Sequence, residues 1–133
     1  RLPKRGQVRF FDRSWYSRAL VQRVNAWCSE TQAQNFLANV SDWEQQSGTR
    51  VIKFYLSISK DEQQYRLNKR KKSPLTYWKF SVNDKLALDS FDRMTLAKEE
   101  CIGTDWIVID YNDKRAGRIA LLERLIEEIK NGQ

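Results

Sequence analysis

The run VIKFYLSISKDEQQYRLNKRKKSP, residues 51–74, joins a strand pattern to a helix pattern. Its first part, residues 51–58, is rich in β-branched and aromatic side chains, which is typical of a strand. Ser59 is followed three residues later by Glu62, the spacing of a capping box at a helix start. The helix is expected to continue to about Lys72, because the proline that ends the run breaks helices. The run therefore predicts a strand followed directly by a helix.

Two further β-rich runs lie far from the first, VRFF at residues 8–11 and WIVID at residues 106–110. Helical patterns occupy the other stretches: Ser14 to about Trp27, Ser29 to about Ser47, Asp84 to about Glu100, and Asp113 to Lys130. Strands that alternate with helices of this length indicate parallel pairing and an α/β layered fold. The nearly continuous apolar strands predict a sheet of three strands that is covered on both faces.

The composition excludes several classes of protein. The chain has 133 residues, the size of one domain, and contains no His, which excludes Ser-His-Asp and Cys-His nucleophiles and His-ligated zinc. Cys28 and Cys101 are far apart, so we expect two buried, reduced thiols in a cytoplasmic protein. No apolar run approaches the roughly 18 residues that span a bilayer, so no membrane partner is expected.

Positive charge is concentrated in two stretches of the chain. Residues 1–23 hold seven basic residues and one acid, and residues 60–80 hold seven basic residues and two acids. The remaining residues are acidic on balance, since the net charge is +7. Such localisation indicates a polyanion site for nucleic acid, nucleotide phosphates or inorganic polyphosphate. An ordinary solvated basic face is the alternative.

The segment FFDRSWYSR, residues 10–18, places a carboxylate between the first expected strand and the helix that follows. Ligands of open α/β sheets bind outside the carboxyl ends of the strands, where Asp12 is expected. An aspartate at such a position holds Mg²⁺ in P-loop kinases. Arg13 and Arg18 add guanidinium groups, which match phosphate oxygens. The alternative is that Asp12 caps the helix or pairs with Arg13.

These residues resemble the family-2 polyphosphate kinases. The run LPKRGQVRFFDRSWYSR at residues 2–18 is similar to that family's second nucleotide-binding motif. Residues 53–63 look like its next strand and helix, SPLTYWKFS at 73–81 like its lid, and DKRAGR at 113–118 like the start of its last helix. The resemblance runs from Leu2 to about Leu125 in the same order.

The resemblance implies a P-loop kinase-like three-layer sandwich with a parallel sheet, here incomplete, so that residues 1–133 form a single partial domain. It also implies phosphoryl transfer between inorganic polyphosphate and a nucleotide, which is ADP, GDP or AMP, or ATP or GTP, with Mg²⁺ as the cofactor. By this likeness Asp12 positions the magnesium ion and orients the acceptor phosphate. Arg13 and Arg18 bind phosphates, and Arg23 is a further candidate for that role.

The second basic stretch would form the lid, residues 66–83. Arg66 and Arg70 are four residues apart on one helix face, so both are expected to bind polyphosphate. Lys79 would bind the same anion. Trp78 would either stack on the nucleotide base or pack the hinge of the lid. Closure of the lid would exclude water, the competing phosphoryl acceptor.

The last candidates for phosphate binding are Lys114 and Arg115. They open the final expected helix, where basic residues are slightly unfavourable for the helix dipole, so a role facing phosphate is more natural than a structural one. Trp15, Tyr16, Trp27 and Trp43 are interpreted as core aromatic residues instead.

One family motif is absent from these residues. No glycine-rich G-x-x-x-x-G-K loop occurs, whereas in the family this loop lies on the first strand, upstream of the residues present here. We therefore expect a fragment that is inactive alone. A homo-oligomer is expected of the intact protein on a separate ground, the exposed aromatic residues expected on its helices. The alternative is a non-catalytic polyanion-binding or dimerisation domain of a tandem protein. Nucleic acid is the weaker interpretation, because Asp12 would repel a nucleic-acid backbone.

Overall fold

The computed structural model describes residues 2–131 and divides into two compact units. Unit 1 comprises the residues up to Val51 together with Asp92–Gly103, and unit 2 comprises Ile52–Phe91 together with the residues from Thr104 onward. The expected single partial domain over residues 1–133 stays a prediction, and its residues 1, 132 and 133 lie outside the described part. No helix of the described residues is long and apolar enough to cross a bilayer.

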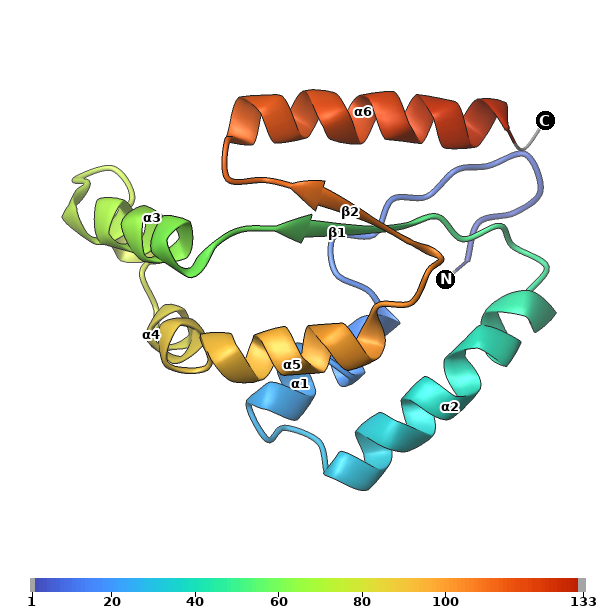
Figure 1. Ribbon diagram of the computed structural model, residues 1–133, viewed down its shortest axis with the longest axis horizontal. Coiled ribbons are helices and arrows are strands. Elements are labelled where there is room, and N and C mark those ends of the chain that lie inside the picture. Colours follow the sequence, from blue (N-terminus) through green and yellow to red (C-terminus); the bar gives the residue numbers. More distant parts are fainter. Residues whose placement is uncertain (1, 132–133) are drawn as a thin grey trace. The chain divides into compact units, whose positions relative to one another are not determined.

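Unit 2 is built on a parallel pair of strands, β1 (Lys53–Ser57) and β2 (Trp106–Asp110). Lys53 is in register with Trp106, and Ser57 with Asp110. Figure 1 shows the two strands side by side, with a helix continuing from each. The expected α/β architecture with parallel pairing is confirmed.

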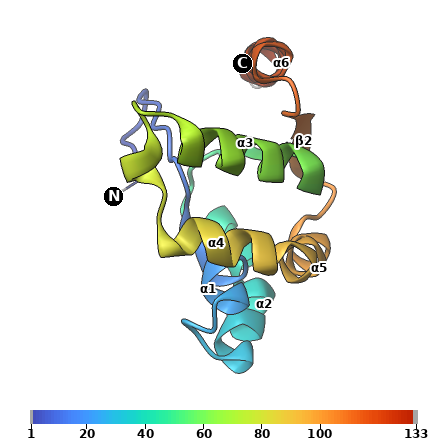
Figure 2. The same ribbon diagram turned by 90° about the vertical axis from the view of Figure 1, so that its left-hand side faces the viewer.

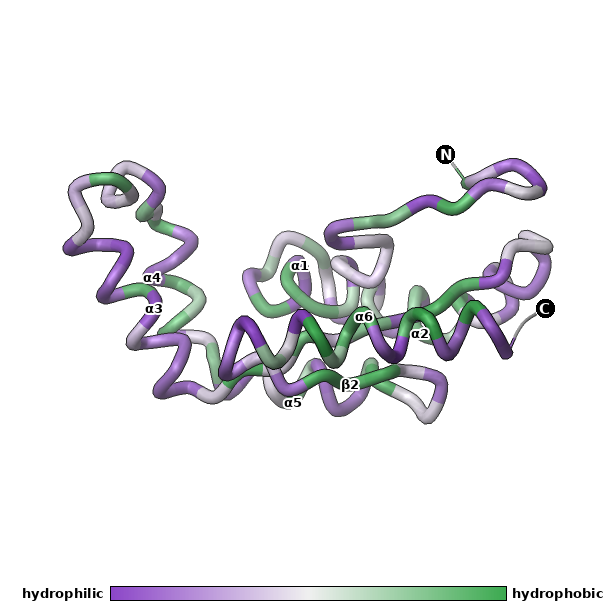
Figure 3. Tube along the Cα trace, turned by 90° about the horizontal axis from the view of Figure 1, so that it is seen from above, coloured by the Kyte–Doolittle hydropathy of each residue, from purple (hydrophilic) through white to green (hydrophobic). Residues whose placement is uncertain are grey.

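A helix begins just beyond each strand. Helix α3 (Lys60–Lys72) is capped by Ser59, whose Oγ accepts from the Glu62 amide at 3.2 Å. Helix α6 (Lys114–Lys130) is capped by Asp113 and packs against β2. Hydrophobic and hydrophilic residues alternate along α6 in Figure 3. Both helices begin where the sequence predicts.

Between α3 and β2 the chain forms the short 3₁₀ helix η2 (Tyr77–Lys79) and helices α4 (Val82–Asp89) and α5 (Phe91–Cys101). Figure 2 shows α4 alongside α3. The single helix expected from Asp84 to Glu100 is wrong, because Ser90 interrupts it with φ −105° and ψ 12°. The Ser90 hydroxyl bonds back to the Leu86 carbonyl at 2.5 Å, which stabilises this break.

In unit 1, the helix predicted over residues 14–27 is present only as two short pieces, η1 (Trp15–Arg18) and α1 (Val21–Val24). Leu20 separates them with the non-helical angles φ −104° and ψ −100°, and Ala26 has a positive φ of 56°. The next prediction is confirmed: α2 (Glu30–Gln46) starts at a capping box of Ser29 and Gln32. Helix α2 ends at Ser47, where Gly48 adopts the left-handed φ of +63°.

The core of unit 1 gathers around Tyr16, which is 5% exposed and meets the Phe36 ring edge-on at 5.5 Å between centroids. Trp15 packs edge-on against Trp43 at 5.0 Å. The core assignment of Tyr16 is therefore confirmed. That of Trp27 is wrong, since this side chain is 58% exposed. Trp43 is also 46% exposed despite its contact.

The third expected strand is absent. Residues 8–11 have no strand assignment, and the described residues form a sheet of β1 and β2 alone. Val8 and Phe10 are 73% and 76% exposed, so neither ladder hydrogen bonds nor side-chain burial orders this run as a strand. Leu56 of β1 and Val108 of β2 are also exposed. The expectation that the described residues cover both faces of the sheet is therefore wrong.

Candidate active site

At the carboxyl edge of the β1–β2 pair, two strand ends lie next to two helix starts, an arrangement that favours anion binding. β1 ends at Ser57 and β2 at Asp110, which are paired, and α3 and α6 start just beyond them. Ligands of parallel sheets bind at this edge, and the amino ends of helices carry partial positive charge. Strand ends followed by helix starts are typical of phosphate-binding edges.

The loop that follows β2 is tied to the residues that follow β1. The Tyr111 amide donates to the Ser57 carbonyl at 2.7 Å, and the Ser59 amide donates to Oδ1 of Asn112 at 2.8 Å. The Asn112 amide in turn donates to Oδ1 of Asp110 at 2.8 Å. The starts of α3 and α6 are therefore bonded to each other through side chains and backbone.

Arg66 reaches this loop from the second turn of α3. Its Nη2 donates to the carbonyls of Tyr111 at 2.6 Å and Asn112 at 2.9 Å, and its Nε donates to Oε1 of Glu62 at 2.6 Å. The Arg66 side chain is 19% exposed. The polyphosphate contact expected of Arg66 stays a prediction, and the structure gives this guanidinium three protein acceptors.

Lys114 and Arg115 lie in the exposed first turn of α6. Oδ1 of Asp113 accepts from the amides of Arg115 at 2.7 Å and Ala116 at 2.9 Å. These backbone hydrogen bonds, the Ala116 bond foremost, hold the pKa of the Asp113 carboxyl below its ordinary value. The capping carboxylate orders this turn, while the two cationic side chains extend from it.

Gly117 allows α6 to start close to the strand end. A Cβ at this position would collide with the Tyr111 ring and would lie 2.9 Å from the Asp110 carbonyl oxygen. Its φ is ordinary for a helix, so the requirement for glycine comes from space and not from backbone conformation. The close approach fixes where Lys114 and Arg115 stand relative to β2.

The expected lid is anchored at both of its ends. Nη1 of Arg70 donates to Oδ1 of Asp84 at 2.8 Å, which joins α3 to α4. The Thr76 hydroxyl donates to the Arg70 carbonyl at 3.3 Å. The Arg70 side chain remains 40% exposed, so it is accessible to an anion as well as paired.

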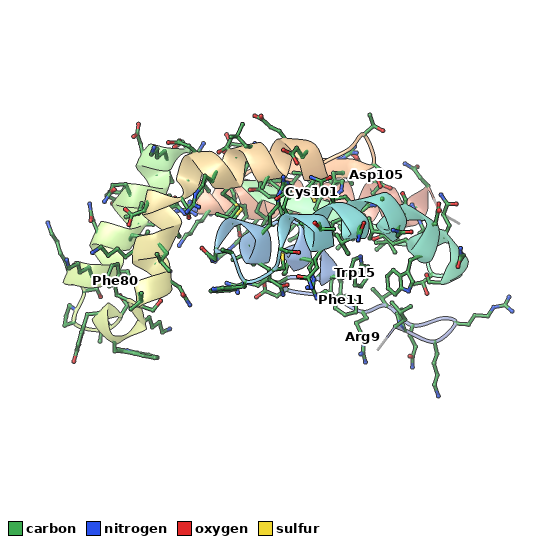
Figure 4. All side chains as sticks on the ribbon, turned by 90° about the horizontal axis from the view of Figure 1, so that it is seen from below. Arg9, Phe11, Trp15, Phe80, Cys101 and Asp105 are labelled. Carbon is green, nitrogen blue, oxygen red and sulfur yellow. The ribbon has the colours of Figure 1, made fainter. Side chains whose placement is uncertain are left out.

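At the tip of the lid, Trp78 is 68% exposed and its Nε1 donates to the Leu75 carbonyl at 3.0 Å. The Lys79 ammonium lies 5.0 Å from the centre of the Trp78 ring, within cation–π range. Phe80, labelled in Figure 4, is approached in the same way by Lys71 at 5.8 Å. The exposed Trp78 ring and the half-buried Phe80 ring are therefore each paired with a lysine ammonium.

Asp12, Arg13 and Arg18 lie in unit 1, and all three are exposed. Arg13 has a positive φ of 66°, a strained conformation for a residue with a side chain. The turn is held from the residues beside it: the Phe11 and Trp15 rings meet edge-on with 5.6 Å between centroids, and Trp15 Nε1 donates to Glu44 at 2.9 Å. Figure 4 labels Phe11 and Trp15. The short segment thus presents one carboxylate and two guanidinium groups to solvent.

Arg23 is paired within unit 1. Its guanidinium donates to Glu30 at 2.5 and 2.8 Å and to Glu100 at 2.6 Å. These bonds raise the pKa of Arg23, while the Arg23 bond, followed by one from Gln34, lowers the pKa of Glu30. Phosphate binding by Arg23 stays a prediction, and its observed partners join α2 to α5.

Sequence reasoning missed Asn112, Glu62 and Asp84 as parts of these arrangements. Asn112 directly follows the strand end, and a polar residue there was the available signal. Glu62 was assigned only to the helix cap, whereas its carboxylate holds Arg66. Nothing in the sequence indicated that Asp84 pairs with Arg70.

The family model described as Polyphosphate kinase 2 matches residues 1–133. The chain therefore belongs to the polyphosphate kinase 2 family, and the resemblance stated from its motifs is confirmed.

Three relatives illustrate the match. NDP-polyphosphate phosphotransferase 2 of Ruegeria pomeroyi is 36% identical over 96% of this chain and 40% of its own length. Polyphosphate kinase PPK2B of Corynebacterium glutamicum is 38% identical over 95% of this chain and 44% of its own. The crystal structure of Polyphosphate Kinase 2 from Arthrobacter aurescens TC1 superposes with a TM-score of 0.83 at 33% identity, over 99% of this chain and 50% of that one. The chain thus spans half or less of the length of these relatives.

Proposed function

We propose that the intact protein carrying this chain moves a phosphoryl group between inorganic polyphosphate and a nucleoside mono- or diphosphate. The observation that carries the proposal is the carboxyl edge of the β1–β2 pair, where the bonded starts of α3 and α6 meet. Lys114 and Arg115 are exposed in the first turn of α6 at that edge. Polyphosphate and nucleotides both carry phosphate groups, which bind at such an edge.

The side chains suit this reaction. Phosphoryl transfer depends on positioning and on stabilisation of charge, and it needs no covalent nucleophile, so a chain without His can take part in it. The proposed phosphate-binding cations share exposure or partial exposure in the structure: they are Arg13, Arg18, Arg70, Lys79, Lys114 and Arg115. Their guanidinium and ammonium groups would bind the anionic oxygens of donor and acceptor.

Asp12 is the proposed magnesium ligand. The described residues hold no group of three or more His, Cys, Asp or Glu side chains that could bind a metal by themselves. Mg²⁺ fits a single exposed carboxylate, because it is commonly held by one or two carboxylates together with phosphate oxygens and water. When bound, Mg²⁺ would neutralise the charge of the phosphates.

Residues 66–83 are the proposed lid over the phosphates. The exposed Trp78 ring offers a surface on which a nucleotide base can stack, and Lys79 beside it supplies a cation. A relative is named as an NDP-polyphosphate phosphotransferase, which supports nucleoside diphosphates as one acceptor class. Closure of the lid would keep water from the reacting phosphates.

We also propose that these 133 residues are inactive alone, since they contain no G-x-x-x-x-G-K loop. The intact protein would be a cytoplasmic homo-oligomer. The oligomer is supported by an exposed apolar row on α6: Ile119, Leu122, Ile126 and Ile129.

The test is a transfer assay with the intact protein, polyphosphate, Mg²⁺ and AMP, ADP or GDP in separate reactions. Formation of the phosphorylated nucleotide, dependent on polyphosphate, is the expected result. Binding of polyphosphate without transfer would instead identify a non-catalytic polyanion-binding domain. Retention on DNA that short polyphosphate does not displace would indicate nucleic-acid binding.

A further inference from the structure

We propose that Arg66 is a positioning residue, which fixes the loop at residues 111–113 and thereby the start of α6, and is not a ligand of polyphosphate. The inference deepens the proposed function and rests on it, because the position of Lys114 and Arg115 matters for transfer only if they bind phosphate. The loop contacts themselves do not depend on any substrate.

The geometry of the guanidinium matches its backbone partners. One nitrogen, Nη2, bridges the carbonyl oxygens of Tyr111 and Asn112 at 2.6 and 2.9 Å. These carbonyls lie after β2 and before α6, outside the strand ladder and the helix. Backbone acceptors at such places need partners from elsewhere, and a charged donor forms a stronger bond than a neutral one. Arg66 therefore provides a donor for the carbonyls of both Tyr111 and Asn112.

The carboxylate of Glu62 orients the guanidinium. It accepts from Nε of Arg66 at 2.6 Å, one helical turn away on α3, and the two side chains are only 25% and 19% exposed. Partial burial makes such a pair less screened than a surface ion pair. The negative charge of Glu62 also offsets the positive charge of Arg66, which would otherwise attract a polyanion. The arrangement thus favours a structural clamp over an open anion-binding group.

The clamp acts on the elements that carry the proposed phosphate-binding groups. Asn112 accepts from the Ser59 amide, so a loop held by Arg66 also holds the start of α3. Asp113, the next residue, caps α6 and precedes Lys114 and Arg115. Arg66 thereby links α3 to the amino end of α6.

Hydrogen–deuterium exchange in the substrate-free intact protein tests the clamp directly. In Arg66→Ala we expect the amides of Ser59 and Tyr111 to exchange about tenfold faster than in the unchanged protein, since charge-assisted hydrogen bonds to the loop are lost. Lys69→Ala removes one charge from the same helix and makes none of these loop contacts, so exchange at both amides should stay unchanged. Unaltered exchange at both amides in Arg66→Ala would overturn the proposal.

Arg66→Lys separates positioning from charge. Lysine keeps the positive charge but lacks the planar fork that bridges Glu62 and two carbonyls. We expect Arg66→Lys to lower kcat for transfer about as far as Arg66→Ala does, with little change in the KM for polyphosphate. If lysine restores full transfer while alanine raises the KM for polyphosphate, Arg66 is a ligand and the proposal fails.

A second variant and a measurement without substrate test Arg66 separately from the proposed function. If Arg66→Ala does not fold, Glu62→Gln retains the arginine and should still speed exchange at the Ser59 and Tyr111 amides, and unchanged exchange there would contradict the clamp. If the intact protein shows no transfer, the proposed function fails, whereas exchange measured without substrate still decides the role of Arg66.

Discussion

The Ser59 amide donates to Oδ1 of Asn112 at 2.8 Å, which bonds the residue that caps α3 to the loop that leads into α6. The two residues are far apart in the sequence and follow neighbouring parallel strands. A single side-chain amide therefore helps to set the spacing of two helix starts at the proposed phosphate site.

Asn112→Ala tests the contribution of this bond. The variant leaves the Ser59 amide without its acceptor, so the free energy of unfolding should fall by about 1 kcal/mol. Denaturation in urea measures it. Asn83→Ala, at an exposed position on α4, is the control and should change stability little. Equal stability of the two variants would contradict this role of Asn112.

Gly117→Ala tests the close approach of α6 to β2. Replacing glycine by alanine inside an exposed helix normally stabilises it by about 1 kcal/mol. Here the new Cβ would collide with the Tyr111 ring and crowd the Asp110 carbonyl, so a net destabilisation of about 1–3 kcal/mol is expected. Thermal unfolding gives the sign, and a stabilised variant would show that α6 is packed less closely than described.

The ion pair of Arg23 and Glu30 predicts a pH dependence of stability in unit 1. The pKa of Glu30 is lowered in the folded protein, so the pair stabilises the fold above the ordinary carboxyl pKa and is lost as the pH falls through the folded-state value. On acidification the Tm of the unchanged protein should therefore fall more than that of Glu30→Gln. Glu123→Gln, on the exposed side of α6, is the control and should follow the unchanged protein. Parallel curves for all three proteins would refute the prediction.

Arg70→Ala tests the lid. Arg70 is 40% exposed and proposed to bind polyphosphate, so its loss should raise the KM for polyphosphate about tenfold and that for the nucleotide much less. Steady-state kinetics with each substrate varied measures both constants. Lys72→Ala removes one positive charge from the same helix and is the control for a general loss of positive charge. A larger effect on the nucleotide would mean that the lid binds the other substrate.

The sequence predicted the parallel strand pair from β-rich runs that alternate with helical patterns. It also predicted α2, α3 and α6, because cap residues such as Ser29, Ser59 and Asp113 act through local hydrogen bonds. It failed where a local pattern needs a partner. The apolar run at residues 8–11 has no ladder among the described residues, and Leu20 and Ser90 break helices whose periodicity continues across them.

In the candidate site too, residue types could be read from the sequence, whereas contacts between distant residues could not. Asp12 and Lys114 were proposed from residue type and position alone, and both are exposed in the structure, while their roles stay predictions. The partners of Arg66 could not, because Tyr111 and Asn112 supply backbone carbonyls, which every residue has. Only the fold decides which carbonyls an arginine meets.

The proposed magnesium role of Asp12 predicts that Asp12→Asn slows transfer from polyphosphate to a nucleotide in the intact protein. The amide keeps the size of the side chain and removes the charge proposed to hold Mg²⁺, so the rate should fall at least about a hundredfold with folding unchanged. Asp42→Asn, exposed on α2 in the same unit, should transfer at the unchanged rate. A rate for Asp12→Asn within a few-fold of the unchanged protein would mean that Asp12 does not hold Mg²⁺.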